Sequence, residues 1–214
     1  MIDQPAKSSP AEHPSDAPAG PLPHAREGRW LAPEFFNRPA QQVAKDLVGK
    51  RLVRRLGESV VAAPVVETEA YVGPHDLACH AARGRTRRTE VMFGPPGTLY
   101  VYFIYGIHWM LNVVTGEEGY AAAVLIRGVE GAVGPGRLTK SLNITGELNG
   151  LPARPAHGLW FEDADDRVPP SRVMRTPRIG IDYAGPVWSA KKLRFVLKPT
   201  ATKNSGRRLP KPAR

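Results

Sequence analysis

The segment TLYVYFIYGIHWMLNVV, residues 98–114, holds two runs of β-branched and aromatic residues on either side of Tyr105-Gly106. A glycine at a tight turn between two such runs is typical of a β-hairpin, so we expect Tyr105 at its tip. A large aromatic side chain there cannot be covered by its own sheet. On a basic protein it suggests a wedge that fills the gap left by an unstacked base. Folding of Tyr105 back onto the domain is the structural alternative.

The sequence around this segment predicts more strands than helices. Strands are expected at 51–56, 59–72, 121–126, 178–181 and 193–197, where β-branched residues are bounded by glycine and proline. Apolar residues at helical spacing predict a helix at 40–47 and a second at 135–142. Strands clustered in hairpins with few helices indicate the α+β class with a mostly antiparallel sheet.

Composition excludes several classes of protein. The chain has 214 residues, 42% hydrophobic and 23% charged, which excludes global disorder, and its net charge of +10 favours a polyanionic partner. A single cysteine, Cys79, excludes a disulfide framework and a cysteine-based zinc site. Without an apolar run of about 20 residues or a signal-type apolar core, we expect a soluble cytoplasmic protein, nucleoid-associated if bacterial, with no membrane partner.

The ends of the chain differ in composition from its middle. Residues 1–28 are rich in proline and alanine and nearly free of large apolar residues, and residues 201–214 are basic. Such segments cannot bury enough surface to offset their conformational entropy. We therefore expect a disordered tail over 1–28, one domain over 29–200, and a basic disordered tail over 201–214.

Residues 65–80, VVETEAYVGPHDLACH, hold a group of acidic, histidine and tyrosine side chains. Alternate residues of a strand share a face, so Glu67, Glu69 and Tyr71 should point the same way. The loop after them adds His75, Asp76 and His80. A solvent-exposed strand face and a metal site are the alternatives, but the spacing matches no zinc-hydrolase signature.

Basic residues could bind a phosphate backbone at two places. RGRTRR, residues 83–88, lies between the strand predicted at 59–72, which carries Glu67 and Glu69, and the hairpin predicted at 98–114. Its Arg83, Arg85 and Arg88 could hold phosphates across a pocket. GPGRLTKSL, residues 134–142, adds Arg137 and Lys140 at a predicted helix start. Solvated surface is the alternative for both.

These segments together resemble the alkyladenine (3-methyladenine) DNA glycosylase family. The resemblance is carried by VVETEAYVGPHDLACH, MFGPPGTLYVYFIYGIHWMLNVV and AAAVLIRGVEG, with support from EFFNRPAQQVAKDLVGKRLVRR, GPGRLTKSL and KKLRFVL. The segments follow the family order over about 29–196. The resemblance implies a single α+β domain with a curved, mostly antiparallel sheet, surrounding helices and a protruding hairpin.

The activity implied by the resemblance is that of a monofunctional glycosylase. Such an enzyme flips an alkylated or deaminated purine (3-methyladenine, 7-methylguanine, hypoxanthine or ethenoadenine) out of duplex DNA and hydrolyses its N-glycosidic bond. Glu69 would be the general base that activates water, and Arg127 would help to hold that water. No lysine nucleophile, metal or other cofactor is implied, and we expect a monomer bound to double-stranded DNA.

The resemblance also assigns the base pocket. Tyr71, His80 and Tyr102 would line it, with aromatic faces around the base and a hydrogen bond from His80. Asn112 would disfavour normal guanine by crowding its exocyclic amine, and Tyr105 would be inserted into the duplex. Electron-poor or cationic purines stack well on aromatic rings, which agrees with the residue types present.

Two departures from the family pattern and two rival functions remain. Only GAV stands between Glu130 and Gly134, where the family has a longer segment, and His108 follows the hairpin where other members carry another aromatic residue.

A non-catalytic nucleic-acid-binding module would use the hairpin aromatics to stack single-stranded bases. A metal-dependent nuclease would use His75, Asp76, His80 and Glu69.

Overall fold

The computed structural model describes residues 30–163 and 168–199, so the predicted tails 1–28 and 201–214 lie outside the described residues. The strands are β1 (Arg51–Leu56), β2 (Ser59–Tyr71), β3 (Leu99–Ile104), β4 (His108–Thr115), β5 (Ala122–Val129), β6 (Ala132–Val133), β7 (Leu159–Glu162), β8 (Val173–Thr176) and β9 (Arg194–Leu197). The α-helices are α1 (Pro33–Phe36), α2 (Ala40–Leu47), α3 (Pro135–Ser141) and α4 (Gly185–Ala190). Short 3₁₀ helices connect them, among them η1 (His80–Arg83) and η2 (Glu90–Phe93).

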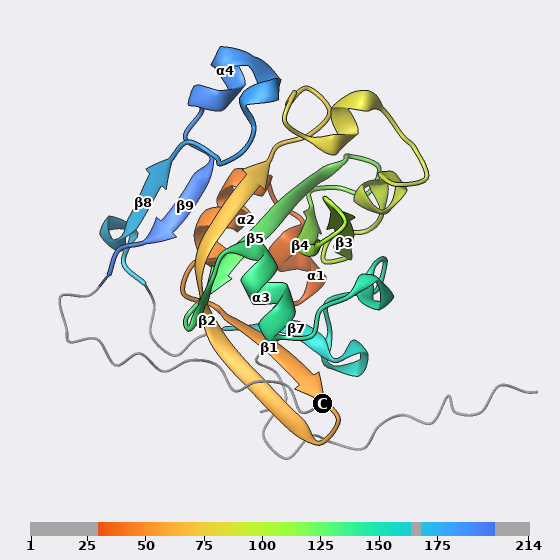
Figure 1. Ribbon diagram of the computed structural model, residues 1–214, viewed down its shortest axis with the longest axis vertical. Helices are drawn as coiled ribbons and strands as arrows, with labels where there is room; N and C mark the ends of the chain where they lie inside the picture. The colour runs from red at the N-terminus through yellow and green to blue at the C-terminus, as the bar shows by residue number, and fades with distance from the viewer. Residues whose placement is uncertain (1–29, 164–167, 200–214) are drawn as a thin grey trace, which may run out of the picture.

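The strands form one curled antiparallel sheet with the order β3-β4-β5-β2-β1-β7, and β9 pairs with both β2 and β8 (Figure 1). The first half of β2 pairs with β1 and its second half with β5 and β9. Register shifts near Glu67 mark a bulge, which lets this long strand bend from one part of the sheet into the other. The predicted α+β class with a mostly antiparallel sheet is confirmed.

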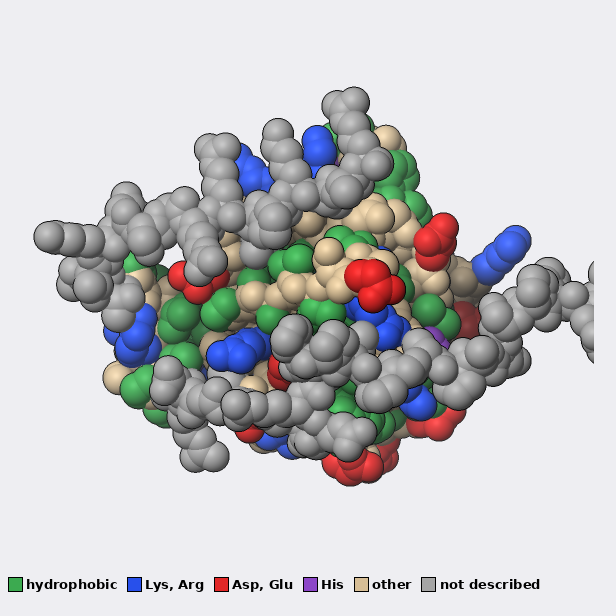
Figure 2. Space-filling view, turned by 90° about the horizontal axis from the view of Figure 1, so that it is seen from below, with side chains coloured by type: hydrophobic (Ala, Val, Ile, Leu, Met, Phe, Trp, Pro, Cys, Tyr) green, Lys and Arg blue, Asp and Glu red, His purple; other side chains and the backbone are tan. Residues whose placement is uncertain are grey.

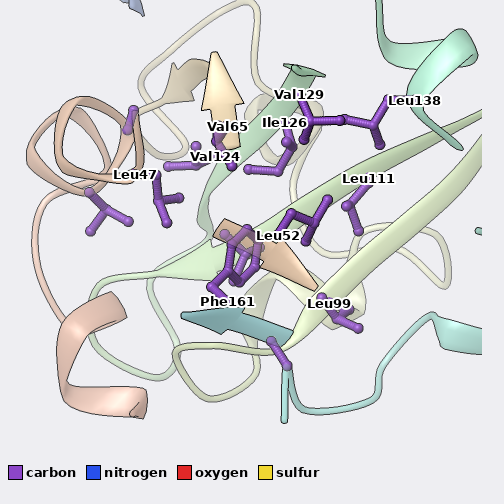
Figure 3. Packing of buried hydrophobic residues seen from close by; sticks show 14 of the residues in the cluster. Leu47, Leu52, Val65, Leu99, Leu111, Val124, Ile126, Val129, Leu138 and Phe161 are labelled. Atoms are coloured by element: carbon purple, nitrogen blue, oxygen red, sulfur yellow. The ribbon is translucent and has the colours of Figure 1, made fainter. Parts of the chain in front are cut away.

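One face of the sheet packs against α1 and α2. The helix α2 buries its apolar stripe, Ala40, Val43, Ala44 and Leu47, against the sheet. Leu52, Val124, Ile126 and Phe161 belong to the same apolar core (Figure 3). The Thr68 hydroxyl donates to the Ala44 carbonyl, so the even-numbered positions of this part of β2 face the helix. The opposite sheet face is therefore left for polar side chains.

The helices at 40–47 and 135–142 and the hairpin are confirmed, but the strand predicted at 178–181 is wrong. The neighbouring strand β8 ends at Thr176, and residues 178–181 form a loop. Backbone and side-chain groups of Arg178 and Ile179 bond to Asp76, Ala70 and Glu69 in place of a strand ladder. Gly180, with φ +73°, also breaks the extended conformation. Across 30–163 and 168–199, no helix combines the length and apolar character needed to cross a bilayer.

Candidate active site

The predicted strand residues lie in a row across the face of the sheet opposite α2. Asn112 on β4 pairs with Tyr100 on β3 and, on its other side, with Leu125 on β5. Leu125 in turn pairs with Glu69 on β2. Directly opposed residues of an antiparallel pair share a face, so Asn112 and Glu69 project on the same side with Leu125 between them. Residues two positions further along each strand, Tyr71, Tyr102 and Arg127, share that face too.

Glu69 is fully enclosed at the centre of this row, with no exposed side-chain surface. Its Oε1 accepts a hydrogen bond from the Ile179 backbone N–H (2.8 Å) and lies 3.4 Å from Arg127 Nη1. Its Oε2 lies 3.0 Å from the Tyr71 hydroxyl, which donates to it. Burial raises the pKa of Glu69, while Arg127, the Ile179 N–H and Tyr71 partly offset that rise. A carboxylate of raised basicity with three ordered partners suits proton abstraction.

The second carboxylate of the strand, Glu67, is occupied by two arginines. Its Oε1 accepts hydrogen bonds from Arg127 Nε (2.8 Å) and Arg194 Nε (2.6 Å). Arg127 therefore bridges Glu67 and Glu69, and its guanidinium is fixed beside the more deeply buried carboxylate. The expectation that Glu67, Glu69 and Tyr71 share a face is confirmed by these contacts, and the solvent-exposed alternative is wrong.

Aromatic rings form the wall beside Glu69. The ring centroid of His80 is 4.7 Å from that of Tyr102, which is 5.1 Å from that of Tyr100. Tyr71 and Tyr102 pack against the same small apolar cluster around Met92. Arg88 stacks over the outer side of Tyr102, with 5.1 Å from its Cζ to the ring centroid.

The His80 imidazole is held in its neutral form. Its Nδ1 lies 3.0 Å from the Tyr100 hydroxyl. Burial lowers the pKa of His80 to about 4, and the nearby Arg88 and Arg83 add to the shift. A neutral imidazole near pH 7 has one donor and one acceptor nitrogen, so His80 can bind a polar base edge in either sense.

Asn112 lies in this row on β4, between Tyr100 and Leu125. Its Nδ2 donates to the Tyr100 carbonyl (3.1 Å), and the side chain is buried. This bond fixes the orientation of the amide and leaves its oxygen as an acceptor. The roles assigned to Asn112 and to the other site residues stay predictions.

The tip of the β3–β4 hairpin carries Tyr105, which is 84% exposed. The Ile107 N–H donates to the Ile104 carbonyl, and the two central residues have positive φ (Tyr105 +54°, Gly106 +69°), as in a type I′ turn. A left-handed tyrosine costs roughly 1–3 kcal/mol, and an exposed ring gains little from packing. Tyr105 therefore does not fold back onto the domain, and its role in DNA binding stays a prediction.

The basic side chains predicted to contact a backbone are all exposed: Arg83, Arg85, Arg88, Arg137 and Lys140. The first three lie in or just after η1, beside the aromatic wall, and the last two lie on α3, which packs against β4. Among the coloured side chains in Figure 2, basic and acidic ones are interspersed. The arginines at 83–88 thus give the site a concentration of positive charge.

The residues of the rival nuclease site have different partners. Asp76 pairs with Arg178, His75 lies 3.3 Å from the Tyr120 hydroxyl, and His80 bonds to Tyr100. Across the described ranges, no three histidine, cysteine, aspartate or glutamate side chains come together as metal ligands. The structure therefore does not assemble the set His75, Asp76, His80 and Glu69.

A cavity of about 670 Å³ lies outside this row. It is lined by residues that include Arg38, Gln41, Tyr120, Trp188 and Lys191, and of the candidate residues from the sequence only His75 lines it. At the predicted site, Arg88 lies over the Tyr102 ring and the Ile179 N–H bonds to Glu69. The Glu69 side chain itself has no exposed surface.

Sequence reasoning missed three residues that complete the site: Arg178, Ile179 and Arg194. All three come from the last quarter of the chain, over 100 positions from the Asp76, Glu69 and Glu67 side chains that they bond. The signal available for Arg178 was an arginine within the short segment Arg178–Ile181, which was predicted to be a strand.

Comparison with known proteins gives consistent matches over the described domain. The family model described as "Methylpurine-DNA glycosylase (MPG)" matches residues 34–133 and 130–201. A protein of Myxococcus xanthus named "Putative 3-methyladenine DNA glycosylase" is 48% identical over 179 residues, covering 78% of this chain and 89% of the relative. Proteins of the same name from Methanocella arvoryzae (45% identical; 72% and 86% covered) and Legionella pneumophila (43%; 79% and 95%) are also similar.

Proposed function

The chain belongs to the methylpurine-DNA glycosylase family, and on that premise we propose that it excises alkylated or deaminated purines from double-stranded DNA by base flipping and hydrolysis. It is a DNA glycosylase of the 3-methyladenine type, a hydrolase that acts on DNA. The range of lesions, the flipping step and the role of Glu69 are the proposal. The proposal is supported chiefly by one observation: the strand register places Glu69, Arg127, Asn112 and the tyrosines Tyr71 and Tyr102 on the same face of the sheet.

The proposed chemistry uses Glu69 as the general base. Water attacks C1′ of the extruded nucleotide while the N-glycosidic bond breaks, and Glu69 takes the proton that the water loses. The negative charge of the carboxylate also stabilises the oxocarbenium-like sugar of the transition state. Arg127, bridged between Glu67 and Glu69, keeps the carboxylate ionised and oriented. The purine leaves with the electron pair of the broken bond, and an abasic site remains.

Water and sugar must be admitted to a carboxylate that is enclosed in the unbound protein. The groups in contact with Glu69 include the Ile179 N–H, the Tyr71 hydroxyl and the Arg127 guanidinium. We propose that a nucleotide entering the site displaces Arg88 from Tyr102 and opens the side of Glu69 that Tyr71 covers. The base would then stack on Tyr71 and Tyr102, with a hydrogen bond to neutral His80. Flipping costs a few kcal/mol, less for a damaged base, which contributes to selectivity.

The decisive test is a single-lesion duplex assay in EDTA. We expect the full-length protein to release free hypoxanthine or ethenoadenine and to leave an abasic site, which mild alkali converts to a strand break. Breaks that appear without alkali and disappear in EDTA would instead support a metal-dependent nuclease. Binding with no base released from a panel of alkylated and deaminated purines would support a non-catalytic module, and either result would refute the proposal.

The hairpin tip gives a separate prediction about binding. Tyr105→Ala should weaken affinity for lesion-containing duplex by about 5- to 150-fold, because stacking of an aromatic ring on a base is worth about 1–3 kcal/mol. Excision should also fall, since the flipped state loses the group that fills the vacated stack. Fluorescence anisotropy with an abasic-analogue duplex measures the change.

Val60→Ala is the control for the hairpin variant. Val60 is an apolar residue, 37% exposed, beside the turn of the β1–β2 hairpin, where no DNA contact is proposed. Its affinity should match that of the wild type. Equal affinity of Tyr105→Ala and Val60→Ala would mean that the tip is not inserted into the duplex.

A further inference from the structure

A fully buried ion pair lies directly behind the proposed site. Arg178 donates to both oxygens of Asp76 (Nη1–Oδ2 2.5 Å, Nη2–Oδ1 2.8 Å), and neither side chain has exposed surface. Asp76 also accepts hydrogen bonds from the backbone N–H groups of Val72 and Ala78. Burying two charges costs desolvation, and an apolar pair of similar size is often as stable. Stability alone therefore does not account for this pair.

The Arg178 guanidinium also contacts the strand that carries the proposed base. Its Nη1 donates to the carbonyl of Ala70 (2.8 Å), which stands between Glu69 and Tyr71 in the chain. Its Cζ lies 4.8 Å from the centroid of the Tyr71 ring, in a cation–π contact. One planar group therefore fixes the backbone between the two residues and supports the ring of the second.

The residue after Arg178 completes the arrangement. The Ile179 N–H donates to Glu69 Oε1 at 2.8 Å. Gly180 follows with a left-handed backbone, so this loop is not held by a strand ladder at that point. The bonds from Arg178 to Asp76 and Ala70 anchor the segment immediately before Ile179, and they direct the Ile179 N–H toward the carboxylate.

We propose that Arg178, clamped by Asp76, is a positioning residue that holds Glu69 and Tyr71 in their reactive arrangement. This inference rests on the proposed function, because it assigns Glu69 and Tyr71 to catalysis and base binding. Because the Arg178 side chain is fully buried, it would contact neither the DNA nor the reacting atoms, and it would act through Glu69 and Tyr71. A lysine keeps the charge but not the planar fork, so it cannot make the two Asp76 bonds, the Ala70 bond and the ring contact together.

The test is Arg178→Lys, measured in single-turnover excision of hypoxanthine over a range of pH. We expect the maximal rate to fall about 10- to 100-fold, because small misplacements of reacting groups cost that much. Affinity for an abasic-analogue duplex should stay within about threefold, since the DNA-facing surface is unchanged. The rate falls as the pH drops through the pKa of Glu69, because a protonated carboxyl cannot accept the proton.

The pH at which the rate has fallen to half of its maximum on the acidic side is the midpoint of the profile. This midpoint distinguishes a positioning role of Arg178 from a general structural role. Loss of the aligned Ile179 N–H removes stabilisation of the ionised carboxylate, so the midpoint should move to higher pH in Arg178→Lys. The charged and titratable groups that face Glu69 are Glu67, Tyr71, Tyr102, Arg127 and Arg178. Of these groups only Arg178 differs in the variant, so a shift of the midpoint reports on the loss of the Arg178 bonds to Asp76 and Ala70.

Arg54→Lys is the matched control. Arg54 is a half-buried arginine on β1 that also bonds three loop carbonyls, those of Leu142, Asn143 and Gly158. It pairs with Val61, eight positions before Glu69 on β2, which is about 25 Å along the strand. Its excision rate and pH midpoint should equal those of the wild type.

A second variant keeps the test valid if Arg178→Lys does not fold. Arg178→Met combined with Asp76→Leu replaces the pair by apolar side chains and leaves no buried charge unpaired. It should show the same loss of rate and the same shift of midpoint. A wild-type rate and midpoint would overturn the inference, as would a loss of rate matched by an equal loss of affinity with an unmoved midpoint. A wild type that releases no base would overturn the proposed function itself.

Discussion

Glu69→Gln should reduce excision of hypoxanthine or ethenoadenine to the background level, a loss of about 10²–10⁴-fold or more. A general base contributes about that factor, and the negative charge that stabilises the sugar is lost with it. Glutamine has nearly the same shape as glutamate. Its amide oxygen can still accept from the Ile179 N–H, and its NH₂ can donate to the Tyr71 hydroxyl, so we expect the fold to be retained.

Binding distinguishes a chemical role of Glu69 from a structural one. The Glu69→Gln protein should bind damaged duplex with nearly wild-type affinity while releasing no base in single-turnover experiments. Glu58→Gln, the same change at an exposed position in the β1–β2 turn, should leave both binding and excision unchanged. Undiminished turnover by Glu69→Gln would refute its assignment as the base.

Phe161→Ala should lower the free energy of unfolding by about 3–5 kcal/mol, the usual cost of a phenylalanine-sized cavity in a core. Phe161 lies on β7, is fully buried, and packs against Phe36 of α1 with ring centroids 5.7 Å apart. Its backbone carbonyl accepts from the Leu31 N–H. The ring thus joins the outer strand of the sheet to the first helix, and its loss leaves a void that neighbours on two elements cannot fill.

Urea denaturation measures the effect as a lowered midpoint at constant slope. Phe103→Ala is the matched control, since Phe103 lies on the hairpin, is 44% exposed and has Trp109 as its ring partner. Phe103→Ala should lower the free energy of unfolding by no more than about 1.5 kcal/mol, because removing a half-exposed ring leaves no cavity in the core and mainly loses the contact with Trp109. Equal destabilisation by both variants would show that β7 and α1 contribute less to the core than their burial indicates.

The alternation of side chains along the strands made much of the site predictable. On β2 the period of two assigned Glu69 and Tyr71 to one face and Thr68 to the other, and the contacts of these residues agree. The Tyr105-Gly106 turn was equally readable, because its neighbours are β-branched and aromatic on both sides. The residue roles needed the family resemblance in addition, since residue types alone were also compatible with a stacking module.

The contributions of the last quarter of the chain were not predictable in the same way. A short apolar stretch at 178–181 has the composition of a strand, but its backbone is used to cover Glu69. The enclosure of that carboxylate follows from a loop contributed 110 positions later, and no local pattern contains that information. The pairing of Arg178 with Asp76 has the same origin, with 102 positions between the partners.

The sequence by itself determined the antiparallel sheet, its two faces, the Tyr105-Gly106 turn and the residue types of the pocket, because each depends on periodicity and turn chemistry within a few residues. The tertiary structure alone decided the strand register that aligns Asn112, Leu125 and Glu69, and the buried network that fixes Glu69. Register and burial depend on which distant segments meet in the folded chain, and their energies come from packing and desolvation rather than from local preference.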